Sequence, residues 1–390
     1  MHIGLHFARR AAVAPFRMLA PLALAALALG ACARGEDKTA ASDSARRDTA
    51  GADSARQGGA AAIGRGSGAP LAYVTNEDGN SITVIDTGRD SVLGTIDVGK
   101  RPRGIKVSPD GGTIYVAVSG SPKAAPGVDE STLPPPDRAA DGIAVIDVAT
   151  HTLQKKLKSG NDPESFAITN DGKTVYVSNE DAGTASVVDI ASGQITDTIR
   201  VGGEPEGVTL SPDGRWVYVT AEEDNEVAVI DTRTNKVVAA IKTGKRPRSV
   251  AFTPDGRKAY VTAEVGGVVD VVNTAGHKLA KSIRIPDKGA KPMGVAVAPD
   301  GKTAYVTTGR GGTVAVIDTQ TDRVVASIKA GERPWGIAVT PDGRKAYTAN
   351  GPSNDVSVID LASRKVIGTV KAGSVPWGVA ITAAGNRATE

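Results

Sequence analysis

The chain of 390 residues carries 46 basic and 43 acidic side chains, and only 4% of its residues are aromatic. Arg9, Arg10 and Arg17 lie in the first 31 residues, which contain no acid, so the remainder has 43 charges of each sign and no basic excess for nucleic acid or an anionic membrane. Cys32 is the only cysteine, which excludes an intramolecular disulfide and a cysteine-based metal cluster.

Residues 1–31 have the pattern of a lipoprotein signal peptide. The three arginines form its positive first region, and residues 18–31 form an apolar run too short to cross a bilayer as a free helix. The run ends in Leu29-Gly30-Ala31-Cys32, which resembles a bacterial lipobox, so we expect lipidation of Cys32 as the mature N-terminus. More than one acyl chain there would anchor the chain to a membrane. The alternative is an ordinary secretory peptide with an incidental cysteine.

Residues 32–69 are predicted to form a disordered tether. They are rich in Ala, Gly, Ser, Asp and Arg, and Ile63 is their only large aliphatic residue. Such a segment cannot bury enough apolar surface to offset the entropy lost on ordering. As a coil it would span roughly 30–35 Å. We therefore expect a cell-envelope protein, held at the periplasmic face of the outer membrane or on the extracellular side of the membrane.

From residue 70 to about residue 385 the chain repeats one unit seven times. Most intervals between repeats are 42 residues, with one of 61 and one of 45. The recurring tyrosines are Tyr73, Tyr115, Tyr176, Tyr218, Tyr260, Tyr305 and Tyr347. The recurring prolines are Pro102, Pro163, Pro205, Pro247, Pro292, Pro334 and Pro376. Two independent markers that recur at the same intervals indicate a repeat architecture.

Each unit reads as four short strands. The first follows the proline and ends at a turn such as Pro212-Asp213-Gly214, and the second carries the tyrosine. The third runs to an aspartate such as Asp231, whose side chain we expect to cap a turn, and the fourth runs to a glycine. The pattern predicts an all-β, seven-bladed β-propeller with four-stranded antiparallel blades. The chain enters at a second strand and leaves after a first strand, so its two ends should complete one closing blade.

The motifs that carry a family resemblance are Tyr-Val-Thr-Asn at 73–76, Tyr-Val-Ser-Asn at 176–179 and the Ser-Pro-Asp-Gly turns at 108–111 and 211–214. They resemble the YVTN-repeat β-propellers, which include YncE-like envelope proteins and, at the level of fold, the haem d1 domain of cytochrome cd1 nitrite reductases. The resemblance implies the propeller fold. It implies no function, because one fold hosts many unrelated sites.

The residue after each recurring proline varies while its surroundings repeat. In a propeller, the loops from fourth to first strands and from second to third strands open on one face at the central channel. We therefore predict that this position forms a ligand-binding channel mouth. Its members are Arg103, Glu164, Glu206, Arg248, Met293, Trp335 and Trp377. A stacking and cation–π platform is one interpretation, and a plugged channel with charges paired between neighbours is the other.

Two further features face the same end of the channel. Acidic second-to-third loops, such as Glu77-Asp78 and Glu180-Asp181, offer oxygen atoms for Ca²⁺, although solvated turn charge is favoured and no metal site is predicted. Residues 119–141 form the one large insertion, in blade two. This proline-rich loop is expected to cover the channel, to present a contact surface or to be passive.

The chain lacks a recognisable catalytic set. His151 and His277 are expected on the opposite face, so no zinc cluster, haem attachment or other cofactor is predicted and no catalytic residue is assigned. The leading hypothesis is a monomeric, non-enzymatic binding or scaffolding module for a small molecule, peptide or envelope protein. The alternative is a metal-dependent hydrolase or lactonase that uses Glu164 and Glu206. Single-stranded nucleic acid, stacked on the tryptophans, is disfavoured by the neutral charge.

Overall fold

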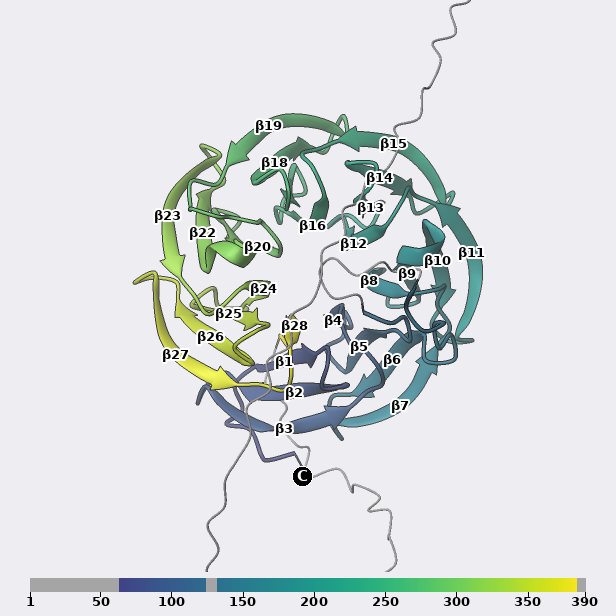
Figure 1. The fold of residues 1–390 in the computed structure, drawn as a ribbon, viewed down its shortest axis with the longest axis horizontal. Helices are drawn as coiled ribbons and strands as arrows, with labels where there is room; N and C mark the ends of the chain where they lie inside the picture. Colours follow the sequence, from purple (N-terminus) through teal and green to yellow (C-terminus); the bar gives the residue numbers. More distant parts are fainter. Residues whose placement is uncertain (1–62, 124–131, 384–390) are drawn as a thin grey trace, which may run out of the picture. The chain divides into compact units, whose positions relative to one another are not determined.

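A computed structural model describes residues 63–123 and 132–383. They form seven four-stranded antiparallel sheets arranged as blades around a central axis (Figure 1). The seven-bladed β-propeller predicted from the repeat is therefore confirmed. The signal peptide, Cys32 and most of the tether lie outside the described residues, as do the middle of the insertion and the last residues of the predicted 70–385 domain.

The strands follow the repeat in order. Blade one contains β28 (Pro376–Ile381), β1 (Leu71–Asn76), β2 (Ser81–Asp86) and β3 (Ser91–Asp97); blade two β4 (Ile105–Val107), β5 (Thr113–Val118), β6 (Gly142–Asp147) and β7 (Thr152–Leu157); blade three β8 (Pro163–Ile168), β9 (Thr174–Asn179), β10 (Thr184–Asp189) and β11 (Gln194–Arg200). Blade four contains β12 (Pro205–Leu210), β13 (Trp216–Ala221), β14 (Glu226–Asp231) and β15 (Lys236–Lys242); blade five β16 (Pro247–Phe252), β17 (Lys258–Ala263), β18 (Val268–Asn273) and β19 (Lys278–Arg284). Blade six contains β20 (Val295–Val297), β21 (Thr303–Thr307), β22 (Thr313–Asp318) and β23 (Arg323–Lys329); blade seven β24 (Pro334–Val339), β25 (Lys345–Asn350), β26 (Asp355–Asp360) and β27 (Lys365–Lys371). Two short 3₁₀ helices, η2 (Glu180–Ala182) and η3 (Gly309–Gly311), lie in second-to-third loops.

The two ends of the repeat close the ring. The last strand, β28, pairs antiparallel with β1, so that Ala72 lies opposite Ile381 and Tyr73 opposite Ala380. The backbone N–H of Leu71 also donates to Thr382 Oγ1 at 2.9 Å. Closure by this shared blade covers the edge of β1, which would otherwise be open to pairing with another chain.

The core lies between neighbouring blades. Second and third strands are buried on both faces, as in β2, while the outermost strands, such as β11, expose nearly every residue. One apolar cluster combines Tyr73 and Ile82 of blade one with Ile114 and Ile146 of blade two. β-Branched residues suit such two-sided burial because they pack densely on a pleated surface.

In most blades the hydroxyl of the recurring tyrosine contacts the next blade. The Tyr176 hydroxyl donates to Asn235 Oδ1 and that of Tyr260 donates to Asp322 Oδ1, both at 2.7 Å, across the blade boundary. Tyr218 contacts His277 Nδ1 at 2.7 Å in the same way. These acceptors lie at the third-to-fourth turns, away from the mouth loops. His277 therefore has a structural partner on the face that the sequence predicted for it.

The third-strand aspartate caps its turn, as predicted. Asp147 Oδ1 accepts hydrogen bonds from the backbone N–H and the hydroxyl of Thr150 at 2.7 and 2.8 Å. Asp189 accepts the equivalent pair from Ser192. These bonds stabilise the ionised form and lower the pKa of both carboxyls.

The hydroxyl of the Tyr-Val-Thr motif ties two blades together at the channel. Thr262 Oγ1 accepts from the backbone N–H of Ser249 in its own blade at 3.0 Å and donates to the carbonyl of Met293 in the next blade at 2.6 Å. Thr307 makes the same bridge between Gly294 and Trp335 at 2.8 and 2.5 Å. The motif thus holds the channel-lining residue of the following blade.

Residues 63–69, which the sequence assigned to the tether, contact blade one. The backbone N–H of Gly64 donates to Leu93 O at 2.9 Å, Ile63 packs against the apolar cluster of blades one and two, and the Ser67 hydroxyl donates to Asp86 at 2.7 Å. The single aliphatic residue of the segment thus reaches the folded body. Within residues 63–123 and 132–383, no helical segment has the length and hydropathy needed to cross a bilayer.

We predict that Thr262→Val destabilises the propeller by about 1–3 kcal/mol, because the isosteric change leaves a buried N–H and a buried carbonyl without their shared partner. Thr262→Ser keeps the hydroxyl, which Ser178 supplies at the same position of blade three, and should retain most of the stability. Urea unfolding of the two variants measures the difference. Equal midpoints for both variants would contradict this role of the hydroxyl.

Candidate functional site

The structure brings the seven post-proline residues together around the axis. All seven line a narrow cavity of about 170 Å³ in the channel. The next residue of each first strand is Gly or Ser because neighbouring strands approach closely there: a Cβ on Gly336 would lie 2.5 Å from Trp377 O, and one on Gly294 would lie 2.5 Å from Trp335 O. The side chains on either side of this crowded position are therefore the ones that can enter the channel.

A second, wider cavity of about 980 Å³ lies over the first, and we call it the mouth chamber. The two cavities share Arg103, Arg248, Met293, Trp335 and Trp377 in their linings. The chamber's remaining walls come from fourth-to-first loops, second-to-third loops and the blade-two insertion. Both loop sets thus open on one face, as the sequence predicted.

The ring of seven divides into two arcs. Blades two to five contribute Arg103, Glu164, Glu206 and Arg248 in order, which we call the charged arc. Blades six, seven and one contribute the apolar arc of Met293, Trp335 and Trp377. The mouth is therefore amphipathic across its diameter.

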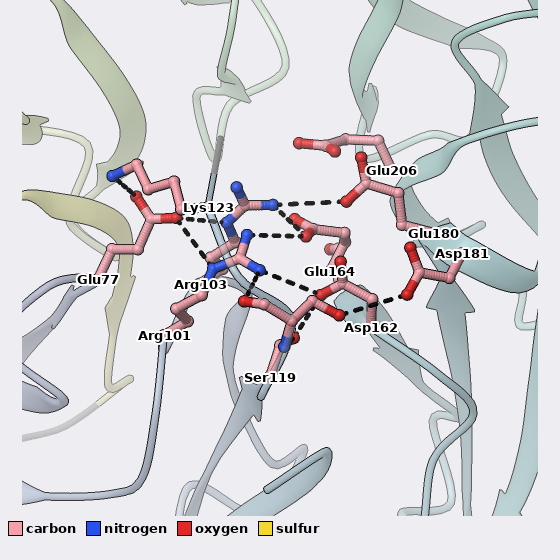
Figure 2. Close-up of polar contacts among 12 residues, drawn as sticks. Glu77, Arg101, Arg103, Ser119, Lys123, Asp162, Glu164, Glu180, Asp181 and Glu206 are labelled. Carbon is pink, nitrogen blue, oxygen red and sulfur yellow. Dashed lines mark hydrogen bonds and ion pairs between the residues drawn. The ribbon is translucent and has the colours of Figure 1, made fainter. Parts of the chain in front are cut away.

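Each glutamate of the charged arc pairs with the arginine beside it. Arg103 forms an ion pair with Glu164 and also reaches Glu77 at 2.9 Å (Figure 2). Arg248 contacts Glu206 at 2.8 Å and forms a second ion pair with Glu222. These carboxylates raise the pKa of both guanidinium groups, against the opposing effect of desolvation. The expected pairing of charges between neighbouring blades is thus present.

Glu180 of η2 adds a third carboxyl beside Glu164 and Glu206. Burial, together with these two acids, raises the pKa of Glu180 to about 11, and burial and Glu164 raise that of Glu206 to about 8, despite Arg248. Glu180 and Glu206 therefore both favour the protonated form at neutral pH, as close and buried carboxyl groups do. In contrast, Arg103 and Lys123 overcome the effect of burial and lower the pKa of Glu77 to about 2.

Asp162, Glu164 and Glu180 form the one described group whose geometry could hold a metal ion. One oxygen atom from each lies within 4.8 Å of the others. Guanidinium groups already surround these oxygens: Arg101 lies 3.5 Å from Asp162, and Arg103 lies 3.8 Å from Glu180. Positive charge at those distances opposes a divalent cation. Acidic loops that the sequence set apart, at 162–164 and 180–181, thus meet at one place.

The two tryptophans pack against each other at the mouth. Their rings lie 5.1 Å apart at 89°, an edge-to-face arrangement. Arg103 lies 5.1 Å and Arg248 5.9 Å from the ring centre of Trp377, so this indole lies between blades two and five. Both tryptophans are half-buried. The indole N–H of Trp335 is buried and has no acceptor among the described residues.

The blade-two insertion contributes to the chamber wall. Lys123 lies 2.9 Å from Glu77 and 3.2 Å from Asp78, and Arg138 forms an ion pair with Asp181. Ser121, Pro122 and residues 133–136 line the chamber. The described parts of the insertion therefore lie beside the mouth.

Lys106 is a channel residue that the sequence interpretation missed. It lines the narrow cavity, three residues after the post-proline position of its blade. Its signal was available: the equivalent residue of the other blades is Ala or Thr. Variation between the blades thus extends along the first strand, beyond the post-proline position.

The fold and the site define the class of protein: a seven-bladed β-propeller with a chamber at the mouth of its channel. The sequence model of the YNCE-like beta-propeller family matches residues 137–259 and 215–387, which together exceed half of the chain. The chain belongs to this family. A comparison with curated proteins found no match.

Solved structures share the fold. Hydrazine synthase of Kuenenia stuttgartiensis is 24% identical, with a TM-score of 0.62 over 72% of this chain and 90% of that one. A Bacteroides fragilis protein described as a candidate 6-phosphogluconolactonase is 19% identical, with a TM-score of 0.65 over 80% and 98%. Dihydro-haem d1 dehydrogenase NirN is 17% identical, with a TM-score of 0.57 over 79% and 74%. At these identities the similarities concern architecture alone.

We predict that stability falls as the pH rises from about 7 to about 9. At neutral pH the folded chain keeps protons on the carboxyls of Glu180 and Glu206. In the unfolded chain the same two carboxyls have the ordinary pKa of 4.5 and have released these protons. The contribution of the two raised pKa values to the stability of the fold is therefore complete below pH 4.5. It is lost as the pH rises through about 8 for Glu206 and through about 11 for Glu180. His151 and His277 do not interfere, because burial lowers their pKa values below 6.5.

Glu180→Gln tests this assignment, because an amide cannot ionise. The variant should lose less stability than the parent chain between the two pH values, as measured by urea unfolding. Glu332→Gln is the control, since Glu332 is exposed in a fourth-to-first loop. If the stability of the parent chain and of Glu180→Gln changes in parallel with pH, the protonation of Glu180 at neutral pH is refuted.

Proposed function

We propose that this chain is a non-enzymatic ligand-binding module of the cell envelope, and that its ligand occupies the mouth chamber. The observation that carries the proposal is the division of the ring into a charged arc and an apolar arc beneath a chamber of about 980 Å³. Ligand pockets commonly combine such apolar walls with a few placed polar groups. The propeller supplies the rigid frame on which they converge.

The chemistry of the chamber favours a ligand with an aromatic part and a basic group. Trp335 and Trp377 offer aromatic surface on one side, and Glu180 offers a carboxyl on the other. Glu180 favours its protonated form in the unliganded protein, since burial and the neighbouring acids raise its pKa to about 11. A bound ammonium group would replace that proton and its charge would be balanced by the carboxylates. Cation–π attraction to the indoles would add to the affinity.

Attachment to the envelope follows from the N-terminal sequence. The lipobox-like Leu29-Gly30-Ala31-Cys32 supports lipidation of Cys32. A lipid anchor would hold the chamber near the membrane, where a small molecule, a peptide or another envelope protein could enter it. Labelling with a radioactive fatty acid tests this step, and Cys32→Ser should abolish the label.

We predict that 2-phenylethylamine binds the chamber more tightly than 2-phenylethanol, and that phenylacetate binds most weakly. The three probes share the aromatic ring and differ in charge. Isothermal titration calorimetry measures their affinities, and titrations in two buffers of different ionisation enthalpy should reveal proton release with the amine alone. Tighter binding of phenylacetate, or no binding of the amine, would refute the proposal.

Two variants assign the contributions of the arcs. Glu180→Gln should weaken the amine and leave the alcohol unchanged, because only the amine uses the carboxylate charge. Trp335→Leu should weaken both probes. Glu332→Gln, which changes an exposed acid of the same face, should alter neither.

A metal-dependent hydrolase is the second candidate, favoured by the proximity of Asp162, Glu164 and Glu180. Glu206, which the sequence hypothesis used, is not part of this group and pairs with Arg248. Arg101 and Arg103 argue against a metal ion at this group, because their positive charges lie beside the carboxylates of Asp162 and Glu180. Native mass spectrometry with added Ca²⁺ decides: a stoichiometric ion that is lost in Glu164→Gln supports the candidate, and its absence removes it.

A further inference from the structure

The outer rim of the propeller does not keep the charge balance of the whole chain. The fourth strands of blades four to seven, β15, β19, β23 and β27, follow one another around the ring (Figure 1). Each begins and ends with an exposed Lys or Arg, and β19 adds Lys281. These four fully described strands thus carry nine exposed cations and no acid, whereas β3, β7 and β11 carry three cations and two acids. We call the outer surface of β15, β19, β23 and β27 the basic rim.

Large aliphatic side chains are exposed between these cations. Val238 of β15 is 50% exposed, Leu279 of β19 44%, Val325 of β23 48% and Ile367 of β27 54%. None of the four strands contains an aromatic residue. Aliphatic groups interspersed with Lys and Arg suit the interface of a membrane, where the aliphatic groups enter the headgroup boundary and the cations meet lipid phosphates. Single-stranded nucleic acid, in contrast, is usually bound on aromatic stacking surfaces.

The cations of the basic rim are largely free of acidic partners. Glu226 forms an ion pair with Lys242 at 2.7 Å, and the other eight cations form no ion pair with a described residue. Acids near these strands have other partners. Asp287 accepts hydrogen bonds from two hydroxyl groups, and Asp322 accepts one from Tyr260 at 2.7 Å. The rim therefore presents positive charge that the fold itself does not neutralise.

The described chain enters the propeller beside the basic rim. Ile63 and Gly64 contact Leu93 of β3, and β27 is the neighbouring outer strand. Cys32, the expected site of lipidation, precedes Ile63 by 31 positions. As the predicted coil, that length of chain would span roughly 30 Å. A chain anchored at Cys32 would thus keep this side of the propeller within reach of the membrane.

We propose that the basic rim binds a membrane surface that is rich in anionic phospholipid. This inference deepens the proposed attachment to the envelope, and it adds a contact made by the folded body itself. A rim that lies against the headgroups places the channel axis along the membrane plane, so the mouth chamber opens sideways to water. A second copy of the chain would not pair through the same surface, because like charges would face each other.

The test is co-sedimentation of residues 33–390 with lipid vesicles. This form lacks Cys32 and the apolar run, and its ring is complete because β28 pairs with β1. We expect at least tenfold tighter binding to vesicles of equal phosphatidylglycerol and phosphatidylcholine than to phosphatidylcholine alone, and weaker binding as salt is added. Equal binding to both kinds of vesicle, or none to the anionic ones, overturns the proposal. Because this form carries no lipid, the result is independent of whether Cys32 is lipidated.

A triple variant and its matched control locate the contact. Replacing Lys329, Lys365 and Lys371 by Gln should weaken binding to the anionic vesicles at least tenfold, since each Lys or Arg at an anionic surface contributes roughly fivefold. Replacing Lys155, Lys156 and Lys158 of blade two by Gln removes the same net charge and should weaken it less than threefold. Equal losses would show that net charge alone acts, which overturns the proposal.

The exposed aliphatic groups distinguish a lipid surface from another polyanion. Val325→Ser combined with Ile367→Ser should weaken vesicle binding several-fold, while Leu153→Ser, an exposed residue of β7, should not. Urea unfolding reports whether each variant keeps its fold. If the double variant binds vesicles as the parent does, and the parent binds an oligo-thymidylate probe as tightly as the vesicles, the rim recognises polyanions in general and the proposal is wrong.

Discussion

The hydroxyl bridges at the axis are the interaction on which the site depends. Thr262 and Thr307 each bond to a backbone N–H of their own blade and to the carbonyl of the channel residue in the next. Seven strands can converge in this way only if the residue beside each bridge is Gly or Ser, because the neighbouring backbone occupies the space of a larger side chain. Because no side chain larger than that of Ser fits at this crowded position, the residues on either side of it line the channel.

This geometry explains why so few positions of the repeat unit differ between blades. Most of the repeat is committed to β-sheet pairing, turn caps and the bonds of the tyrosines between blades, as in Tyr176 with Asn235. A change there affects stability. The post-proline residue and Lys106 line the channel instead, so their side chains can differ between blades without changing the pairing of the strands. Clustering at the axis also couples the charges of different blades, since burial and the neighbouring acids raise the pKa values of Glu180 and Glu206.

The fold could be predicted almost entirely, because its constraints are local and repeated seven times. Proline, tyrosine, aspartate and glycine each mark a strand or turn within one unit, and the half-units at the ends imply closure. The boundary of the tether was placed too late, since Ile63 alone gave no periodic signal for its packing on blade one. The candidate site could be predicted as a set of positions, from variation within the repeat at Arg103 and its equivalents.

By itself, the sequence determined the number of blades, the closing blade, the face on which the variable loops open and the identity of the seven channel residues. Only the tertiary structure decided which charges neutralise each other, that Trp377 lies between Arg103 and Arg248, and that Lys106 lines the same cavity as the seven post-proline residues. The physical reason is the distance along the chain over which each kind of interaction acts. Strand and turn preferences act within one repeat unit, whereas ion pairing, desolvation and cavity size depend on side chains brought together from several blades.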